Sequence, residues 1–132
     1  MRGVKIGQIQ FSAAPFLAEP EGPYTLLPGG VTLDAEAFGG MEVVPAGTAI
    51  GRTYEERDAG AAVGPVAVEN GAVVDDEVFL IAYDVRLGTD GNEAVLVKPG
   101  ATVFEDRLPG FYELDDAVKA ALRARYTMIT SA

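Results

Sequence analysis

Glycine and proline interrupt this chain so often that long regular elements are excluded from most of it. The sequence has 16 Gly and 8 Pro in 132 residues, and they fall between short apolar runs. Proline removes a backbone donor, and both residues favour turns over the interior of an element. This spacing is typical of many short strands. The hydrophobic content of 48% can supply the core of one domain. We therefore expect a compact, small α+β domain that is rich in β-strands.

Residues 1–28 are expected to form an extended N-terminal arm, and residues 29–132 the β-rich domain. Prolines divide the arm, and each one restricts the residue before it to an extended conformation: Pro15, Pro20, Pro23 and Pro28. Residues 4–11 have the composition of a strand, but their apolar side chains change parity near Gly7. This change indicates either a bulge or burial on both faces.

Short strands are expected over residues 31–33, 42–44 and 49–54. Residues 34–40 could form a helical turn or a strand, because periodicity cannot decide over so few residues. The polar residues 55–60 are expected to form a loop.

The second half is expected to contribute most of the sheet. Residues 63–68 are apolar enough for a buried strand, but Pro65 cannot donate to a ladder, which places it at a strand start or an edge. Asn70-Gly71 predicts a hairpin turn. Residues 77–87 form the longest β-like run, and we expect them to be the central strand, with one end covered on both faces. Further strands are expected over residues 93–98 and 101–104.

One helix is predicted near the C-terminus, from Asp115 to about Arg125. An aspartate at its start can accept hydrogen bonds from the first-turn amides, and basic residues gather toward its end, where the helix dipole favours them. Its apolar side chains share one face, which we expect to pack on the sheet: Leu114, Val118, Ala121, Leu122 and Tyr126.

The charge and the missing residue types exclude several classes of function. The chain has 10 basic and 20 acidic residues, a formal net charge of −10, and neither histidine nor cysteine. The excess of acid repels nucleic acids. The commonest general base, the commonest metal ligand and the strongest nucleophile are all missing. No apolar run is long enough for a membrane span or a secretion signal, so we expect a soluble protein made in the cytoplasm. We expect no enzyme activity, no cofactor, and neither nucleic acid nor membrane as a partner.

The acidic clusters and one glycine-rich turn offer weak candidates for chemistry. Consecutive carboxylates at residues 75–77 and 105–106 would point to opposite faces of a strand, so they do not predict a catalytic acid pair. Residues 88–93 offer oxygen ligands for calcium, but they lack the spacing of an EF-hand loop and are better explained as a hairpin turn. We therefore expect no catalytic residue and no metal site.

A series of short motifs follows one order along the second half of the chain. Gly-Ala-Ala-Val-Gly stands at 60–64, Lys-Pro-Gly at 98–100 and Phe-Glu-Asp at 104–106. Pro109, a basic helix at 119–125 and an apolar end at 126–130 come next. In this order and spacing, residues 58–132 resemble the head decoration (capsid cement) proteins of lambda-like tailed bacteriophages. Residues 1–57 match that family least.

The resemblance implies a structural capsid decoration protein, typically a homotrimer. It would bind the major capsid protein on the outer face of the expanded phage head, where capsomers meet. There it would stabilise the virion against the pressure of packaged DNA. An acidic surface fits a position away from DNA.

Two groups of residues are the candidates for binding the capsid or a neighbouring subunit. The arm can add a strand to a sheet edge of such a partner, because unpaired main-chain groups there accept an extended segment. Its candidate residues are Val4, Lys5, Ile6, Gln8, Ile9 and Phe11. The resemblance adds Glu105, Asp106 and Arg107, which precede the bend near the subunit contacts of the family. These three could equally form a solvated ion pair of little consequence.

The alternative is a β-rich surface-recognition module of a virion or cell surface, which binds a glycan or a host protein. Such a module needs an aromatic-lined groove. The chain has no Trp, 5 Tyr and 6 Phe, which weakens this alternative.

Overall fold

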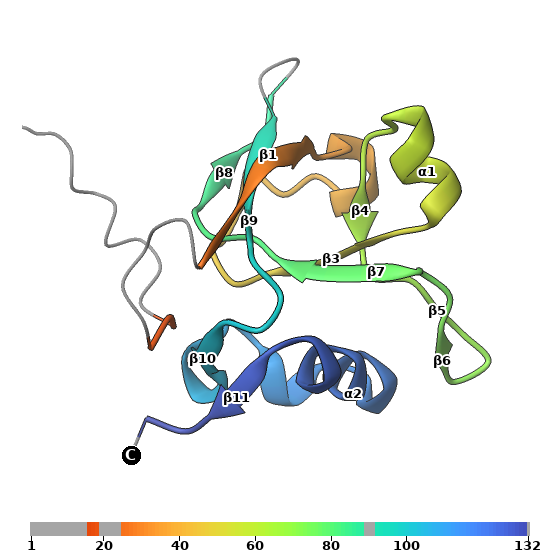
Figure 1. Cartoon of the computed structure of the whole chain (residues 1–132). Coiled ribbons are helices and arrows are strands. Elements are labelled where there is room, and N and C mark those ends of the chain that lie inside the picture. The colour runs from red at the N-terminus through yellow and green to blue at the C-terminus, as the bar shows by residue number, and fades with distance from the viewer. Residues whose placement is uncertain (1–15, 19–24, 89–91, 132) are drawn as a thin grey trace, which may run out of the picture.

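Short strands joined by turns make up most of the part of the chain that the structure describes, residues 16–18, 25–88 and 92–131. In this computed structural model strands outnumber helices, so the predicted β-rich α+β fold is confirmed (Figure 1). The strands are β1 (Leu26–Thr32), β2 (Val43–Val44), β3 (Ala49–Arg52), β4 (Gly64–Pro65), β5 (Val68–Glu69), β6 (Ala72–Val73), β7 (Glu77–Leu80), β8 (Val85–Arg86), β9 (Glu93–Val97), β10 (Thr102–Phe104) and β11 (Thr127–Ile129). The α-helices are α1 (Tyr54–Ala59) and α2 (Asp116–Arg125), and the 3₁₀-helices are η2 (Ala35–Phe38), η3 (Glu105–Arg107) and η4 (Phe111–Glu113).

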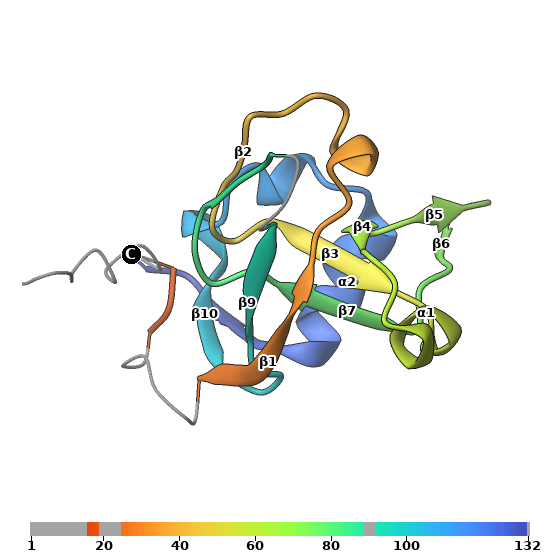
Figure 2. The ribbon, with the colours of Figure 1, turned by 90° about the horizontal axis from the view of Figure 1, so that it is seen from above.

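Five of the strands pair in a ring. β1 pairs with β9, and a bridge between Ile81 and Leu96 connects β9 to the end of β7. β7 pairs with β3, and β3 with β4. The ring closes at Val63, whose amide donates to the Thr32 carbonyl over 2.9 Å and whose carbonyl accepts from the Asp34 amide over 2.8 Å. Figure 2 shows β1 and β9 lying across the β3–β7 pair.

Two hydrophobic clusters lie on opposite faces of β7. Phe79 belongs to the first cluster, to which every strand of the ring or a residue beside it contributes. Val78 and Leu80 belong to the second cluster, on the face that α2 covers. Successive side chains of a strand point to opposite faces, so β7 is buried on both sides. This confirms the expectation that one end of the 77–87 run is covered on both faces.

The predicted C-terminal helix is confirmed as α2. Asp115 caps it, because its Oδ1 accepts from the Ala117 amide over 3.0 Å. Val118 and Leu122, which are 5% and 0% exposed, pack in the second cluster. The other members of the predicted face also contact this cluster: Leu114, Ala121 and Tyr126. No helix of the described residues is long and apolar enough to cross a membrane.

The Tyr126 hydroxyl connects β7 to β9 next to the bridge where they pair. It accepts from the Leu80 amide over 3.0 Å and donates to the Val97 carbonyl over 2.8 Å. Burial raises the pKa of Tyr126 to about 12. The protonated hydroxyl therefore takes the place of a ladder hydrogen bond between two strands that diverge.

Residues 77–87 form two strands, so the prediction of one central strand is wrong. After β7 ends at Leu80, the Ala82 amide donates to the Val95 carbonyl over 2.7 Å. The Asp84 Oδ1 then accepts from the Ala46 amide, also over 2.7 Å. These contacts turn the chain away from β3, and β8 pairs with β2 instead. In the sheet β4-β3-β7 the central strand is β3.

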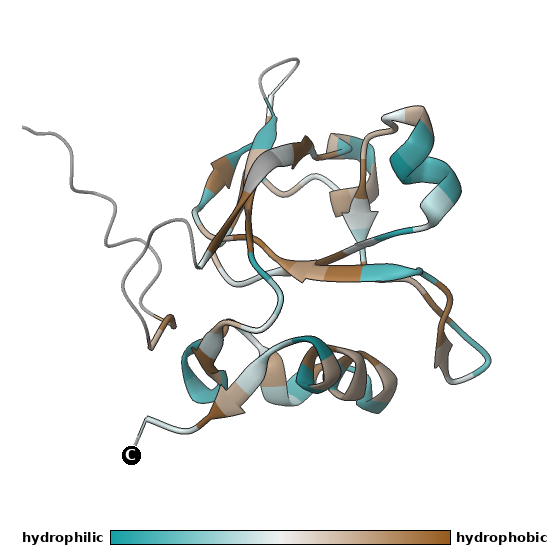
Figure 3. Cartoon of the chain, viewed as in Figure 1, coloured by the Kyte–Doolittle hydropathy of each residue, from teal (hydrophilic) through white to brown (hydrophobic). Residues whose placement is uncertain are grey.

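The polar loop predicted at residues 55–60 is also wrong, because these residues form most of α1. The Thr53 hydroxyl accepts from the Glu56 amide over 3.1 Å, and the Glu56 Oε1 accepts from the Thr53 amide over 2.8 Å. This capping box satisfies two amides at the helix start. No residue of α1 is buried, and Figure 3 shows the helix as largely hydrophilic. Its polar composition reflects exposure and not irregular structure.

One of the turn predictions is confirmed, and another is corrected. Asn70 and Gly71, with φ of 54° and 78°, join the hairpin of β5 and β6. Pro65 lies in β4, at an edge of its three-stranded sheet, as expected, but residues 63–68 do not form one buried strand, because β4 ends at Pro65 and β5 begins at Val68 in another sheet. Among the described residues β8 and β9 pair with β2 and β1 and not with each other, so the strands on either side of residues 88–93 do not form the predicted hairpin. The segment left open at 34–40 contains η2, where the Asp34 Oδ1 accepts from the Glu36 amide.

Parts of the predicted arm belong to the domain. Phe16 is 1% exposed in the second cluster, and Leu17 pairs with Val103 of β10. The expected boundary between residues 28 and 29 falls inside β1. Pro15 and Pro20 flank the short paired segment and do not interrupt it, which is why it can join a strand. Residues 1–15 and 19–24 lie outside the described residues, so an extended arm over them stays a prediction.

Candidate functional site

The candidate residues Glu105, Asp106 and Arg107 form the single turn η3, directly after β10. β10 pairs in parallel with β11, and Phe104 is the register partner of Ile129. The motifs at 104–106 and 126–130 therefore lie side by side, although the sequence separates them by the whole of η4 and α2.

Glu105 connects η3 to the two elements that follow. Its carboxylate accepts from the Tyr112 hydroxyl over 3.0 Å, and from both Nε and Nη2 of Arg123 over 3.3 Å. The Glu105 side chain is only 13% exposed, and the Arg123 guanidinium lies over the Phe111 ring at 5.3 Å. Partial burial, followed by the hydrogen bond to Glu105, raises the pKa of Tyr112. The Glu105 carboxylate thus fixes η4 and α2 next to the end of β10.

Asp106 points to a different partner, the end of the chain beyond β11. Its Oδ1 accepts from the Ser131 amide over 2.9 Å, and its Oδ2 accepts from the Ser131 hydroxyl. The hydrogen bond from that hydroxyl is the largest cause that lowers the pKa of Asp106. Because Glu105 and Asp106 face separate partners, they do not form an acid pair.

Arg107 lies on the exposed side of η3. Its guanidinium stacks over the Phe104 ring at 4.4 Å. Two large exposed side chains belong to neighbouring elements: Tyr112 of η4 is 51% exposed and Ile129 of β11 is 39% exposed. The structure therefore gathers a basic, an aromatic and an aliphatic group around the bend. The arm candidates Val4, Lys5, Ile6, Gln8, Ile9 and Phe11 lie outside the described residues.

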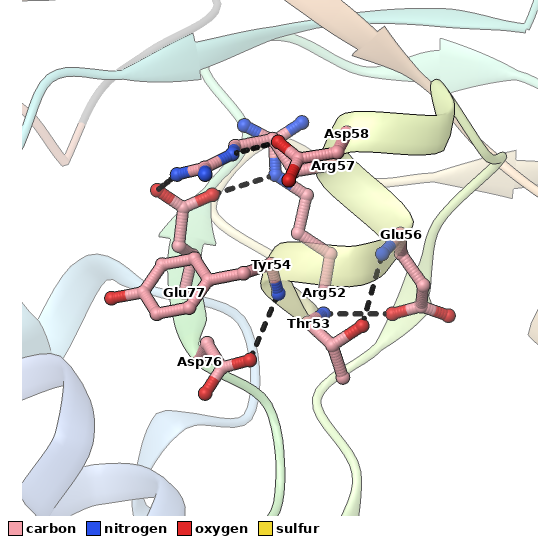
Figure 4. A network of polar contacts seen from close by, with 8 residues as sticks. All are labelled: Arg52, Thr53, Tyr54, Glu56, Arg57, Asp58, Asp76 and Glu77. Carbon is pink, nitrogen blue, oxygen red and sulfur yellow. Dashed lines mark hydrogen bonds and ion pairs between the residues drawn. The ribbon is translucent and has the colours of Figure 1, made fainter.

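The second acidic cluster, residues 75–77, also serves the fold. Glu77 forms an ion pair with Arg52 over 2.8 Å, and Asp76 accepts from the Tyr54 amide at the start of α1 (Figure 4). Asp75 accepts from the Ala67 amide over 2.8 Å. Burial is the largest cause that raises the pKa of Asp75, and the charges of Glu56 and Asp76 add to it. Each of the three carboxylates therefore bonds to a different segment of the chain. Within the described residues no group of three or more acidic side chains could hold a metal ion.

One feature that the sequence did not reveal is an apolar pocket of about 170 Å³ between the ring and α2. Its lining comes from three separate parts of the chain, residues 47–49, 65–66 and 108–122: Gly47, Thr48, Ala49, Pro65, Val66, Leu108, Pro109, Phe111, Leu114, Val118 and Leu122. No local pattern could predict it, because these three parts lie far apart in the sequence. The Thr48 hydroxyl donates to the Pro45 carbonyl over 2.7 Å, so this polar side chain is already satisfied.

Comparison of the chain with protein-family models, with curated proteins and with solved structures gives no match.

Proposed function

We propose that this chain is a structural decoration protein that binds the outer face of an expanded phage head where capsomers meet. The proposal rests on the ordered motifs of residues 58–132. One observation of the structure supports it most: the motifs after residue 97 come together around one bend, while the motif at 60–64 lies where the ring closes. The Gly100 amide donates to the Arg125 carbonyl over 2.8 Å, Phe104 is in register with Ile129, and Asp106 holds Ser131.

In this proposal the bend is the surface that contacts other subunits. Glu105 and Asp106 shape the bend through contacts within the chain, while Arg107, Tyr112 and Ile129 face outward. Tyrosine and arginine side chains that are exposed in the free protein and become buried on binding often contribute most of the binding free energy of an interface. Arg107 and Tyr112 are therefore the residues of this surface that we expect to contact a neighbouring subunit or the major capsid protein.

The proposed mechanism is stabilisation by mass action. A protein that binds only the assembled, expanded lattice stabilises it by an amount that grows with its concentration over its dissociation constant. A homotrimer multiplies weak contacts, because the second and third subunits bind at a high effective concentration. Equilibrium ultracentrifugation should show trimers in solution or on the lattice, and a strict monomer in both would contradict the trimer.

The function is tested by sedimentation with empty heads of lambda-like phages that lack their own decoration protein. We expect the chain to sediment with expanded heads and to stay in the supernatant with unexpanded ones. Arg107→Ala should weaken binding, whereas Arg57→Ala, at the exposed helix α1, serves as the matched control and should not. Equal recovery with expanded and unexpanded heads, or none with either, would contradict the proposal.

A further inference from the structure

The tip of the β5–β6 hairpin carries an asparagine that is followed by glycine. Asn70 and Gly71 form the whole turn between Glu69 and Ala72, which pair with each other. Their φ angles are 54° and 78°, as a type I′ turn requires. Both residues are exposed, and Figures 1 and 2 both show the hairpin projecting from the rest of the ribbon. Water therefore reaches the Asn70 side-chain amide and the Gly71 main-chain amide.

No hydrogen bond of the described residues holds either of these two amides. In a two-residue hairpin the ladder bonds join the residues that flank the turn, here Glu69 and Ala72. β5 and β6 have two residues each and form a sheet of their own, and a hairpin without further strands is only marginally stable. The turn can therefore open locally, which lets the Gly71 nitrogen approach Cγ of Asn70.

The other asparagine of the chain, Asn92, lacks these features. It is 8% exposed. Its Oδ1 accepts from the Gly88 amide over 2.9 Å, and its Nδ2 donates to the Gly88 carbonyl over 3.1 Å. The next residue is Glu93, whose side chain hinders attack by its own main-chain nitrogen. Asn92 is thus a control for Asn70 within the same molecule.

We propose that Asn70 is a site of spontaneous deamidation through a cyclic imide. The Gly71 main-chain nitrogen attacks Cγ of Asn70, the C–N bond of the side-chain amide breaks, and the NH₂ group leaves as ammonia with the proton of the Gly71 nitrogen. Glycine has no side chain to hinder this attack. Water then opens the imide at either of its carbonyls, which gives aspartate or isoaspartate. The reaction consumes one water, needs no oxidant or reductant, and adds one negative charge to the chain.

Isoaspartate at this position loosens the hairpin from α2. It places the former Asn70 Cβ in the main chain, and a two-residue turn cannot take an additional main-chain atom without loss of the Glu69–Ala72 register. Val68 and Val73 of the hairpin pack against the second cluster, which α2 covers. Loss of the register exposes these apolar side chains and so lowers the free energy of unfolding. This inference does not depend on the proposed function.

Peptide mass spectrometry of the full-length protein, aged in mildly alkaline buffer, tests the reaction. The peptide with Asn70 should give two products, one with aspartate and one with isoaspartate, whereas the peptide with Asn92 stays unchanged. Conversion should be slower in mildly acidic buffer, because the attack needs a deprotonated Gly71 nitrogen. Asn70 that stays intact as long as Asn92 would overturn the proposal. Aspartate without isoaspartate would also overturn it, because this outcome indicates direct hydrolysis of the side chain.

Thermal unfolding and methyl NMR of the same samples test the consequence for the hairpin. The melting temperature of the natural chain should fall with age, and the Val73 methyl signals should shift. Asn70→Gly is the matched control, because glycine accepts the positive φ of this position and has no side-chain amide to lose. Its melting temperature and its Val73 signals should not change with age. A natural chain that forms isoaspartate but keeps both properties would contradict the loosening of the hairpin.

Discussion

At the scale of single residues, a few buried polar groups decide how the strands are joined. Tyr126 is the clearest case, since its hydroxyl serves the Leu80 amide and the Val97 carbonyl at once. The sequence placed Tyr126 on the apolar face of the helix, which is confirmed. It could not reveal the hydroxyl's partners, because they lie 46 and 29 residues away.

Tyr126→Phe should destabilise the fold, because it leaves a buried amide and a buried carbonyl without partners. The expected loss is about 1 to 3 kcal/mol in the free energy of unfolding, measured with urea. Tyr112→Phe is the matched control, since its hydroxyl bonds Glu105 at an exposed site. The control should change the free energy by no more than about 0.5 kcal/mol. Equal losses in both variants would mean that the buried hydroxyl is not a strand connector.

Asp75 predicts a pH-dependent contribution to stability. Its pKa in the folded protein is raised above the ordinary value of 3.8, chiefly by burial. The folded state therefore binds the proton more tightly than the unfolded state, and this stabilisation is present at low pH and lost as the pH rises through the folded pKa. Asp75→Asn stays neutral, so its melting temperature relative to the natural chain should rise between pH 4 and pH 7. A difference that is constant with pH would contradict this account.

At the scale of elements, the sequence predicted the helix and the turn whose formation depends on residues close together in the chain. The apolar face of α2 and the Asn70-Gly71 hairpin follow from patterns of a few residues. The capping box of α1 was also present in the sequence as Thr53 and Glu56, but the polar composition of residues 55–60 suggested a loop. The break between β7 and β8 was not predictable, because the apolar run is nearly continuous and Asp84 bonds Ala46, which is 38 residues away.

Leu122→Ala tests whether α2 is packed as the structure describes. Leu122 is 0% exposed, and truncation at such a site costs on the order of 2 to 5 kcal/mol. Ile129→Ala is the control, because that side chain is 39% exposed and should cost clearly less. If urea unfolding shows Leu122→Ala to be no more costly than Ile129→Ala, α2 does not cover the second cluster.

At the scale of the whole molecule, an acidic domain follows a first segment, residues 1–15, whose charged side chains, Arg2 and Lys5, are both basic. The described residues place the two hydrophobic clusters in one domain, joined through β7. The carboxylates at residues 75–77 and 105–106 bond to other segments of this domain and so stabilise it. The candidate sites of contact with other molecules are the bend around η3 and residues 4–11. Residues 4–11 lie outside the described residues.

The most direct test of capsid decoration is the temperature at which empty, expanded phage heads disrupt. If the chain is a decoration protein, saturating amounts should raise this temperature, because binding to the assembled lattice opposes its disruption. Removal of residues 1–12 should weaken the effect, since the arm candidates are lost. A disruption temperature that does not change at any concentration of the full-length chain would contradict the central claim.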